Sequence, residues 1–325
     1  MKDFMLLDVY PDKSHYKIND KINICIDIDC KAECSIKVDM RLYYFNDCIC
    51  VQSDNINISK EKHNYNIALK NMPVGELGGY GVIVSIENME MSTAFDVVNH
   101  WSDRPRYAFL SDFYKEDESD DKDVLSLLKH HINIAQFYDC IYKNKDLLPK
   151  TDYYTDLLDR KLSRIAVENK IELCRKAGIL PQAYGAVYAA SKGYYSMHKD
   201  MALYTNDDRP QNLGDWFFIM NISEESPWRE HILDEFRKTV TEMNFAGIHM
   251  DTYGFPKMAY SKLNRHRKLE KLNEQFPSLI NETKKILDKE TDENALTFNA
   301  VSNWSIEDVA VSNQDAVYIE VWDPQ

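Results

Sequence analysis

The sequence has no long hydrophobic run. Apolar residues make up 44% of its 325 positions, but no run approaches the roughly 20 residues that a membrane-spanning helix needs. The N-terminal stretch MKDFMLLDVY is interrupted by Asp8 and does not contain the apolar segment of a secretory signal. From the sequence as written we therefore expect a cytoplasmic protein with no membrane partner, or an extracellular protein if a leader has been removed.

The sequence also has little positive charge. Its formal net charge is -14 at pH 7, and no local cluster of lysine and arginine offsets it. A surface of this kind repels phosphate groups, which argues against nucleic acid and anionic membranes as partners. A neutral substrate is more compatible with this charge.

The seven cysteines do not have the paired Cys-x-x-Cys spacing of a zinc site. Reduced and mostly buried thiols are the simplest interpretation. The acidic run EDESDDKD (116–123) resembles a cation-binding loop, but a solvated approach to a helix is the commoner meaning of such a run. We therefore expect neither a metal nor a cofactor.

Residues 1–100 have the pattern of β-strands. INICIDI (22–28) places an isoleucine at every second position, and the same period of two recurs in three later stretches. These are IKVDMRLYY (36–44), YNIAL (65–69) and YGVIVSI (80–86). Since turn-rich segments and no helical stretch separate them, they predict an immunoglobulin-like β-sandwich.

Residues 101–325 alternate strand-like runs with amphipathic helices. The predicted strands are 106–113, 132–139, 180–190, 247–251, 295–301 and 315–324. The predicted helices lie near 121–131 and 155–177, from Pro227 with Ser226 as its cap, across 262–288, and at SIEDVA (305–310). We interpret WFFIMNIS (216–223) as part of a long loop after the third strand. The repeated units predict a catalytic (β/α)8 barrel of the TIM type that is truncated after about six strands.

Acidic residues follow four of the predicted strands, at Asp112, Asp139, Asp251 and Glu320. The C-terminal ends of barrel strands form the mouth in which chemistry takes place. Glycoside hydrolysis requires two facing carboxylates, one that attacks or stabilises the anomeric carbon and one that protonates the leaving oxygen. Asp251 and Glu320 come from strands two apart, which could bring both carboxylates to one sugar.

Each of these carboxylates also has a plainer interpretation. Asp251 could cap a helix or form a structural salt bridge, although Tyr253 and Gly254 do not suit an immediate helix start. Glu320 could be a loop carboxylate paired with an arginine, but its apolar neighbours in YIEVW are expected to raise its pKa, as a general acid requires. Asp112 and Asp139 could bind sugar hydroxyls or stabilise the barrel rim.

Aromatic residues gather near the same strand ends, where ring faces suit the C–H faces of sugars. They are Tyr138, Tyr184, Tyr188, Tyr253, Trp304, Tyr318 and Trp322. Some aromatic residues must be plain core residues, and Phe217, Phe218 and Tyr318 are the first candidates. His249 points to the same side of its strand as Asp251, so it could contact substrate or be a core histidine bonded to a neighbour.

Five ordered motifs resemble glycoside hydrolase family 66, the dextranases and cycloisomaltooligosaccharide glucanotransferases. They are PRYAFLSDF, HINIAQFYD, AYGAVYAA, GIHMDTYG and YIEVW, and the resemblance extends from about Leu7 to the C-terminus. It implies an immunoglobulin-like domain, a (β/α)8 barrel and a C-terminal β-domain, usually in a secreted protein. The implied activity is cleavage of α-1,6-linked glucan with retention of configuration. The sequence departs from the family at Cys140, where an aromatic residue is usual, and in the absence of the last barrel strands.

The resemblance also implies residue roles. Asp251 would be the nucleophile and Glu320 the general acid/base, with Asp112, Tyr138, Asp139 and Asn299 in contact with the sugar. We add Tyr184, Tyr188, His249, Trp304 and Trp322 as candidates for substrate contact because of their positions at strand ends. The expected partner is an α-glucan or an isomaltooligosaccharide. The predicted function is that of a retaining, dextranase-like hydrolase, with a cyclising glucanotransferase or a non-catalytic glucan-binding fragment as alternatives.

Overall fold

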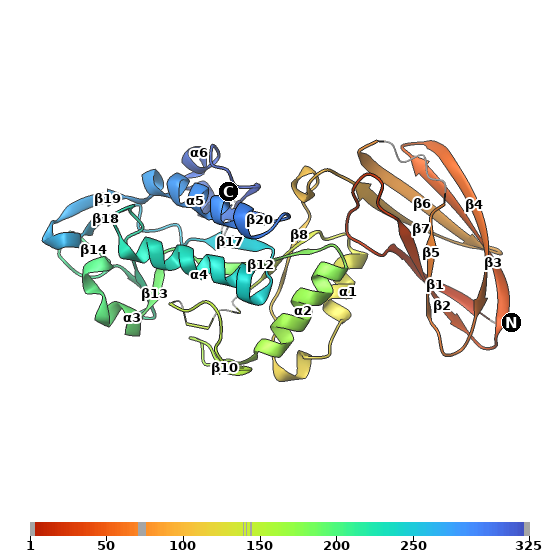
Figure 1. The fold of residues 1–325 in the computed structure, drawn as a ribbon, viewed down its shortest axis with the longest axis horizontal. Helices are drawn as coiled ribbons and strands as arrows, with labels where there is room; N and C mark the ends of the chain where they lie inside the picture. Colours follow the sequence, from red (N-terminus) through yellow and green to blue (C-terminus); the bar gives the residue numbers. More distant parts are fainter. Residues whose placement is uncertain (1–3, 71–75, 139, 141, 144, 322–325) are drawn as a thin grey trace. The chain divides into compact units, whose positions relative to one another are not determined.

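The computed structural model describes residues 4–70, 76–138, 140, 142–143 and 145–321 (Figure 1). The chain divides into two compact units. The first unit contains Met1–Ala108, Asp121–Ile134 and Leu173–Ile179, and the second contains Phe109–Asp120, Ala135–Glu172 and Leu180–Gln325. The domain boundary between residues 100 and 101 stays a prediction.

The first unit contains the predicted β-sandwich, which is confirmed. One antiparallel sheet has the strand order β1-β2-β5 and the other the order β4-β3-β6-β7. The strands are β1 (Phe4–Pro11), β2 (Asn23–Cys30), β3 (Cys34–Tyr44), β4 (Asp47–Ile58), β5 (Asn64–Ala68), β6 (Gly78–Ile86) and β7 (Met89–Val97). Every second residue of β3 and β6 is buried, because one face of each strand meets a shared apolar core.

The second unit is built on a six-stranded sheet with the order β21-β20-β17-β12-β9-β8. Its strands are β8 (Tyr107–Leu110), β9 (Ile134–Phe137), β12 (Leu180–Ala186), β17 (Gly247–Asp251), β20 (Ala295–Asn299) and β21 (Ala316–Tyr318). The pairs β12–β17, β17–β20 and β20–β21 are parallel. The predicted six-stranded part of a TIM-type barrel is therefore confirmed.

Short strands in the long loops form smaller sheets of this unit. WFFIMNIS contributes β16 (Phe217–Ile219) to such a sheet, as its interpretation as a loop segment predicts. The remaining short strands are β10 (Tyr153–Thr155), β11 (Lys161–Ser163), β13 (Ala189–Ser191), β14 (Leu203–Tyr204), β15 (Asn212–Leu213), β18 (Met258–Ser261) and β19 (Lys268–Lys271).

Helices follow most strands of the large sheet. The α-helices are α1 (Lys122–Lys129), α2 (Arg164–Lys176), α3 (Lys192–Met197), α4 (Pro227–Met243), α5 (Leu272–Glu290) and α6 (Ile306–Val309). The 3-10 helices are η1 (Trp101–Asp103), η2 (Lys115–Asp117), η3 (Lys199–Met201), η4 (Leu263–Arg265) and η5 (Val301–Asn303). In the second unit, α4 packs beside α5 and against β17 (Figure 1).

Two helices begin later than the sequence predicts. The segment 155–163 is a hairpin connection rather than helix, because the buried Asp156 carboxylate accepts hydrogen bonds from the backbone N–H groups of Leu158 and Arg160. The segment 262–271 is likewise non-helical, since Asn264 and Arg265 have positive φ values and β19 follows. In both segments apolar residues keep a helical spacing although polar residues form a turn, so the spacing predicts a helix that begins too early.

The predicted helix ends are partly correct. Gly178 ends α2 with φ +68°, and the N–H of Ile179 donates to the carbonyl of Cys174 at 2.8 Å. Pro227 stands at the start of α4 as predicted, but the hydroxyl of Ser226 forms no capping hydrogen bond within the described residues. Ser226 therefore occupies the N-cap position, but its side chain does not cap the helix.

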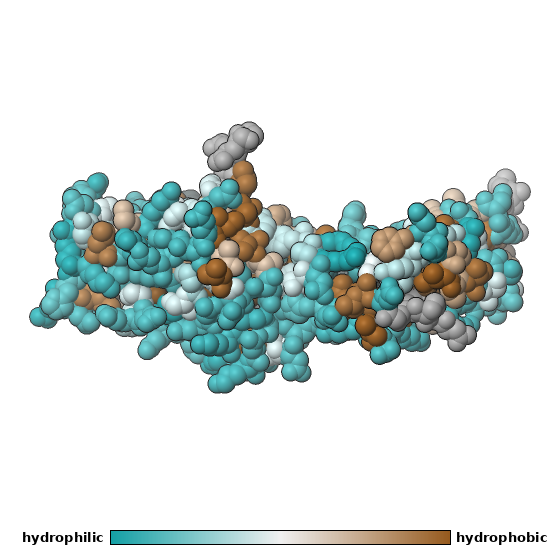
Figure 2. All heavy atoms as spheres, turned by 90° about the horizontal axis from the view of Figure 1, so that it is seen from above, coloured by the Kyte–Doolittle hydropathy of each residue, from teal (hydrophilic) through white to brown (hydrophobic). Residues whose placement is uncertain are grey.

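Hydrophilic residues dominate the face seen in Figure 2, where apolar residues gather in a few small patches. Among the residues described, no helix is both long and apolar enough to cross a membrane. The described cysteines are all free thiols.

Candidate active site

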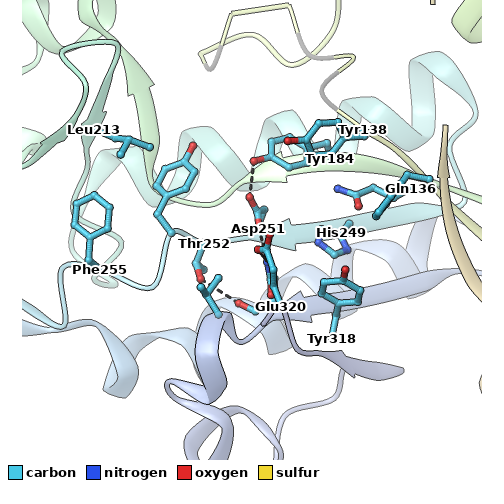
Figure 3. Close-up of a pocket in the computed structure, with 14 residues that line it drawn as sticks. Gln136, Tyr138, Tyr184, Leu213, His249, Asp251, Thr252, Phe255, Tyr318 and Glu320 are labelled. Carbon is cyan, nitrogen blue, oxygen red and sulfur yellow. Dashed lines mark hydrogen bonds between the residues drawn. The ribbon is translucent and has the colours of Figure 1, made fainter. Parts of the chain in front are cut away.

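A cavity of about 480 Å³ lies at the C-terminal ends of the parallel strands. The predicted site residues that line it are Tyr138, Tyr184, His249, Asp251, Asn299 and Glu320. Strand β17 places His249 and Asp251 on one side of the sheet, and the neighbouring strands β12 and β20 place Tyr184 and Asn299 beside them. The parallel sheet thus brings together side chains that are far apart in the sequence (Figure 3).

Gly247 explains how closely β17 and β20 approach each other. A Cβ atom at this position would lie 1.9 Å from the carbonyl oxygen of Ala295. Only glycine is compatible with that distance, because the obstacle is the backbone of the neighbouring strand. The approach of these two strands brings Asp251 and Asn299 within hydrogen-bonding distance.

One amide joins the two predicted catalytic carboxylates. The Nδ2 group of Asn299 donates to Asp251 Oδ1 and to Glu320 Oε2, each at 2.7 Å. The two oxygens therefore lie at most twice that distance apart. The Tyr184 hydroxyl donates to the other oxygen of Asp251. The Oδ1 atom of Asn299 is buried with no partner among the described residues, and it cannot exchange places with Nδ2 without meeting two carboxylates.

The pKa of Asp251 is raised to about 6, chiefly by burial and also by the nearby charge of Glu320. The hydrogen bonds from Tyr184 and Asn299 act in the opposite direction, because they stabilise the ionised form. The cavity leaves a part of Asp251 exposed, but protein atoms surround its carboxylate closely. Asp251 is therefore ionised only above about pH 6.

The expected enclosure of Glu320 by its apolar neighbours is wrong. Ile319 is 40% exposed and Val321 is 61% exposed, so neither covers the carboxylate. Glu320 itself is half-buried at the cavity.

His249 is only 2% exposed, yet it reaches the cavity. Its Nδ1 atom lies 3.1 Å from the hydroxyl of Thr297, which in turn lies 3.3 Å from Oε1 of Gln182. Burial lowers the pKa of His249 to about 3, so the ring is neutral in ordinary buffers. Both interpretations of His249 therefore have support, since it is bonded to a neighbour and also lines the cavity.

Aromatic rings form much of the cavity wall. The rings of Tyr138 and Tyr184 lie 5.8 Å apart, and that of Phe109 lies 6.1 Å from Tyr138. Tyr138 is 46% exposed, which leaves a ring surface open for a ligand. Tyr318, which the sequence suggests is a core residue, lines the cavity and packs edge-on against His249 at 5.1 Å.

The described lining of the cavity leaves out three predicted residues. Tyr188 is fully buried, and its hydroxyl donates to the carbonyl of Phe255 and accepts from the N–H of Tyr253, so it stabilises the loop after β17. Trp304 packs its ring against a core phenylalanine at 5.5 Å. Asp112 is exposed and its backbone carbonyl accepts from Lys170, which fits a role at the barrel rim. Two further predicted residues, Asp139 and Trp322, lie outside the described residues.

Sequence reasoning also missed several lining residues. They are Phe109, Gln136, Leu213, Thr252, Phe255 and Val301. Gln136 could have been found, because it lies on β9 two residues before Tyr138, which directly follows the strand, and the predicted strand 132–139 places both on the same side. Leu213 and Phe255 come from loops, in which no periodicity indicates direction.

A metal-binding arrangement is not evident in the part of the chain that the structure describes. There, no three histidine, cysteine, aspartate or glutamate side chains converge as a ligand set. In the acidic run 116–123, Glu118 instead accepts a hydrogen bond from the hydroxyl of Ser163.

A parallel barrel sheet with two carboxylates at its strand ends and aromatic walls is an arrangement known from the class of enzymes that cleave or transfer glycosidic bonds. The profile of glycosyl hydrolase family 66 matches residues 11–325. The chain belongs to glycosyl hydrolase family 66, and the resemblance seen in the sequence is confirmed.

Two relatives are similar over nearly the whole chain. A cycloisomaltooligosaccharide glucanotransferase of Niallia circulans is 21% identical over 339 residues, which cover 97% of this chain and 35% of the relative. The crystal structure of a cycloisomaltooligosaccharide glucanotransferase from Paenibacillus sp. in complex with cycloisomaltoheptaose has a TM-score of 0.85 and 21% identity. This match covers 98% of this chain and 48% of the other and shows a shared fold. The chain thus spans about a third of one relative and about half of the other.

Proposed function

We propose that this chain contains the catalytic centre of a retaining enzyme that cleaves α-1,6-linked glucan, with Asp251 as nucleophile and Glu320 as general acid/base. The observation that carries the proposal is the position of Asn299 Nδ2, 2.7 Å from an oxygen of each carboxylate. Retaining glycosidases hold their two carboxyl groups about 5–5.5 Å apart, whereas inverting enzymes need roughly 6.5–9.5 Å to admit a water molecule. A single amide that touches both carboxylates supports the shorter separation.

The proposed reaction has two steps. In the first, an oxygen of Asp251 bonds to the anomeric carbon while the glycosidic oxygen leaves and takes the proton of Glu320. In the second, Glu320 removes a proton from water, the water oxygen bonds to the anomeric carbon, and Asp251 leaves as a carboxylate. Two inversions give net retention of configuration.

The surroundings of Asp251 fit a nucleophile that must be ionised. Tyr184 and Asn299 each donate a hydrogen bond to its carboxylate and so favour the charged form against burial. Because the pKa of Asp251 is about 6, kcat/KM is expected to fall as the pH drops below about 6. The walls formed by Tyr138, Tyr184 and Tyr318 offer ring faces to the pyranose units on either side of the scissile bond.

The test measures release of isomaltooligosaccharides from dextran. Asp251→Asn should lower kcat by roughly 10⁴-fold or more, as removal of a covalent nucleophile does. Asp292→Asn is the matched control, because it changes an exposed acid of the same unit outside the described lining of the cavity and should keep near-normal activity. If Asp251→Asn retains its activity, the assignment of the nucleophile is wrong.

A second experiment separates the two carboxylate roles. Glu320→Ala should lose hydrolysis of dextran. With an aryl isomaltooligosaccharide, whose leaving group needs no protonation, added azide should restore turnover by attacking the intermediate on Asp251 without needing a proton donor. The product would be an α-glucosyl azide, whose configuration also reports retention. An azide product of β configuration would contradict the two-step reaction.

Transfer to a second sugar is the competing outcome for the same two carboxylates. The two relatives named above are both glucanotransferases, which favours this candidate. Products without reducing ends would show that the chain forms cyclic isomaltooligosaccharides rather than hydrolysing the linkage. Calorimetric binding of isomaltooligosaccharides without any turnover would instead favour a glucan-binding fragment.

A further inference from the structure

The β-sandwich unit has a cavity of its own, of about 360 Å³, for which the proposed reaction has no use. Its floor is the face of β6 and β7 that points away from the sandwich core. Gly81 lies opposite Ala94 there, and Gly79 lies opposite Asp96. These small residues leave a flat floor on which a planar ligand or side chain can lie.

One wall of this cavity is polar. The carboxylate of Asp96 is 6% exposed and pairs with Arg104 at 3.2 Å and with Arg106. A Cβ atom on Gly79 would lie 3.1 Å from Nη1 of Arg104, so the glycine makes room for this guanidinium group. Each guanidinium group has five N–H donors, of which one carboxylate uses only some. The Nη1 atom of Arg106 is buried with no partner among the described residues.

Phe45 lies at the edge of the same cavity, with an exposed ring and an unfavourable backbone conformation. It is 84% exposed, and its φ of +52° lies in the left-handed region at the tip of the β3–β4 hairpin. Glycine, asparagine and aspartate suit such turns, whereas a bulky residue at positive φ is strained. The ring contacts that of Tyr44 edge-on at 4.7 Å. Exposure and strain therefore both destabilise the free protein, as is common where a residue serves a ligand.

These features match the chemistry of a neutral sugar chain. An exposed ring can stack on the C–H face of a pyranose, and a paired guanidinium and carboxylate can bond to adjacent hydroxyl groups. The carboxylate of Asp96 offsets part of the charge of Arg104 and Arg106. We propose that this surface, formed by Phe45, Arg104, Arg106 and the floor of β6 and β7, is a second glucan-binding site. The α-1,6 linkage of that glucan rests on the proposed function.

The test uses electrophoresis of the folded chain through native gels that contain dextran, with Asp251→Asn present in every variant to prevent cleavage. Phe45→Ala should weaken the apparent association constant for dextran about five- to tenfold, because the stacking surface is lost. Phe45→Trp should restore it. The matched control is Val51→Ala, which removes an exposed apolar side chain from β4 outside the described lining of this cavity.

Stability measurements distinguish a binding role from a structural one. Phe45→Asn should lower dextran binding while leaving the melting temperature unchanged or higher, since asparagine tolerates the left-handed turn. A fall in melting temperature together with unchanged binding would overturn the proposal. Equal retardation of the parent, Phe45→Ala and Val51→Ala proteins, or no retardation of the parent, would also overturn it.

The two proposals can fail separately. Phe45→Ala in the chain that retains Asp251 should hydrolyse a short isomaltooligosaccharide at the parent rate, because such a substrate occupies the barrel cavity alone. Weaker dextran binding by Phe45→Ala in a chain without turnover would support the sandwich site and contradict the proposed reaction. Normal turnover with no effect of Phe45→Ala on dextran binding would support the proposed reaction and contradict the sandwich site.

Discussion

The sandwich and the barrel sheet use their interiors in opposite ways. The core of the sandwich is built of apolar side chains, and isoleucine or valine fills most of the inward positions of β2 and β6. The strands of the barrel sheet carry polar side chains at positions that are nearly inaccessible to solvent. These are Gln136, Gln182, His249, Thr297 and Asn299.

This difference shows where each unit gains stability and where it loses some. Burial of an apolar side chain contributes about 1.5–3 kcal/mol, whereas a buried polar group is costly unless it finds a hydrogen-bond partner. The polar groups of the barrel sheet bond to one another and to Asp251, but the Oδ1 atom of Asn299 finds no partner among the described residues. The barrel sheet thus gives up some stability to hold polar side chains at the cavity.

The largest expected effect compares one glycine in each sheet. Gly247→Ala forces a Cβ atom against the backbone of β20, which no rotamer change can relieve, so we expect a loss of more than about 5 kcal/mol. Gly81→Ala in β6 meets its nearest atom at 3.8 Å and should change the free energy of unfolding by less than about 1 kcal/mol. Soluble yield and urea denaturation measure both. Similar midpoints for the two variants would contradict the close approach of β17 and β20.

The next effect concerns the apolar core of the sandwich. Ile24 is fully buried, and Ile24→Ala should cost about 4 kcal/mol through lost burial and the cavity left behind. Ile24→Val, as the matched control, should cost about 1 kcal/mol. Dextran turnover by the protein that remains folded should not change. If kcat of the folded protein instead fell about as steeply across these variants as their free energy of unfolding, the two units would not divide stability and activity in this way.

A smaller effect is expected from the amide between the carboxylates. Asn299→Ala removes two hydrogen bonds and should lower kcat by about 10²-fold, in the range of a lost transition-state donor. Because the bond from Asn299 lowers the pKa of Asp251, its loss should also shift the acid limb of kcat/KM to higher pH. Asn313→Ala, an exposed asparagine of the same unit, should alter neither. An unchanged acid limb would contradict the role of the amide.

The smallest effect is a gain in stability. The folded pKa of Asp251, about 6, lies above its unfolded value of 3.8, so the folded state binds more protons between these values. The stabilisation that the protonated Asp251 gives to the folded state is therefore full below about pH 4 and is lost as the pH rises through about 6. Asp251→Asn should stabilise the protein by on the order of 1–3 kcal/mol at pH 7.5 and by little at pH 4. Thermal melts of both proteins across pH would detect this, and a difference that does not vary with pH would contradict it.

Strands β2, β3, β5 and β6 of the sandwich and the six strands of the barrel sheet could be predicted because each period is local, whereas β1, β4, β7 and the strand order of the sandwich were not predicted. Alternation indicates the sandwich strands, and apolar runs that end in Asp251 or Glu320 indicate both the barrel and the two acids at its mouth. The early part of the predicted helix 155–177 is wrong because the turn is set by the carboxylate of Asp156, not by the apolar spacing. The predicted cytoplasmic location stays a prediction.

The arrangement within the site was harder to predict. Asn299 is expected to touch sugar, but the sequence contains no sign that its amide lies between the two carboxylates, which depends on the packing of β17, β20 and the segment after β21. Tyr188 looks like Tyr184 in the sequence, yet it turns inward to hold the loop at Phe255. Side-chain direction beyond the end of a strand depends on loop structure that no period encodes.

The hydrogen bonds among Gln182, His249 and Thr297 have a consequence for assembly of the sheet. His249 lies directly opposite Thr297, and each stands two residues before a site residue, Asp251 or Asn299. A slip of one residue between β17 and β20 would turn Asp251 towards the helices and leave these buried polar groups unpaired. The buried hydrogen bonds therefore favour one register, because only the pairing of β17 and β20 that places Asp251 and Asn299 at the cavity also pairs the polar groups beneath them.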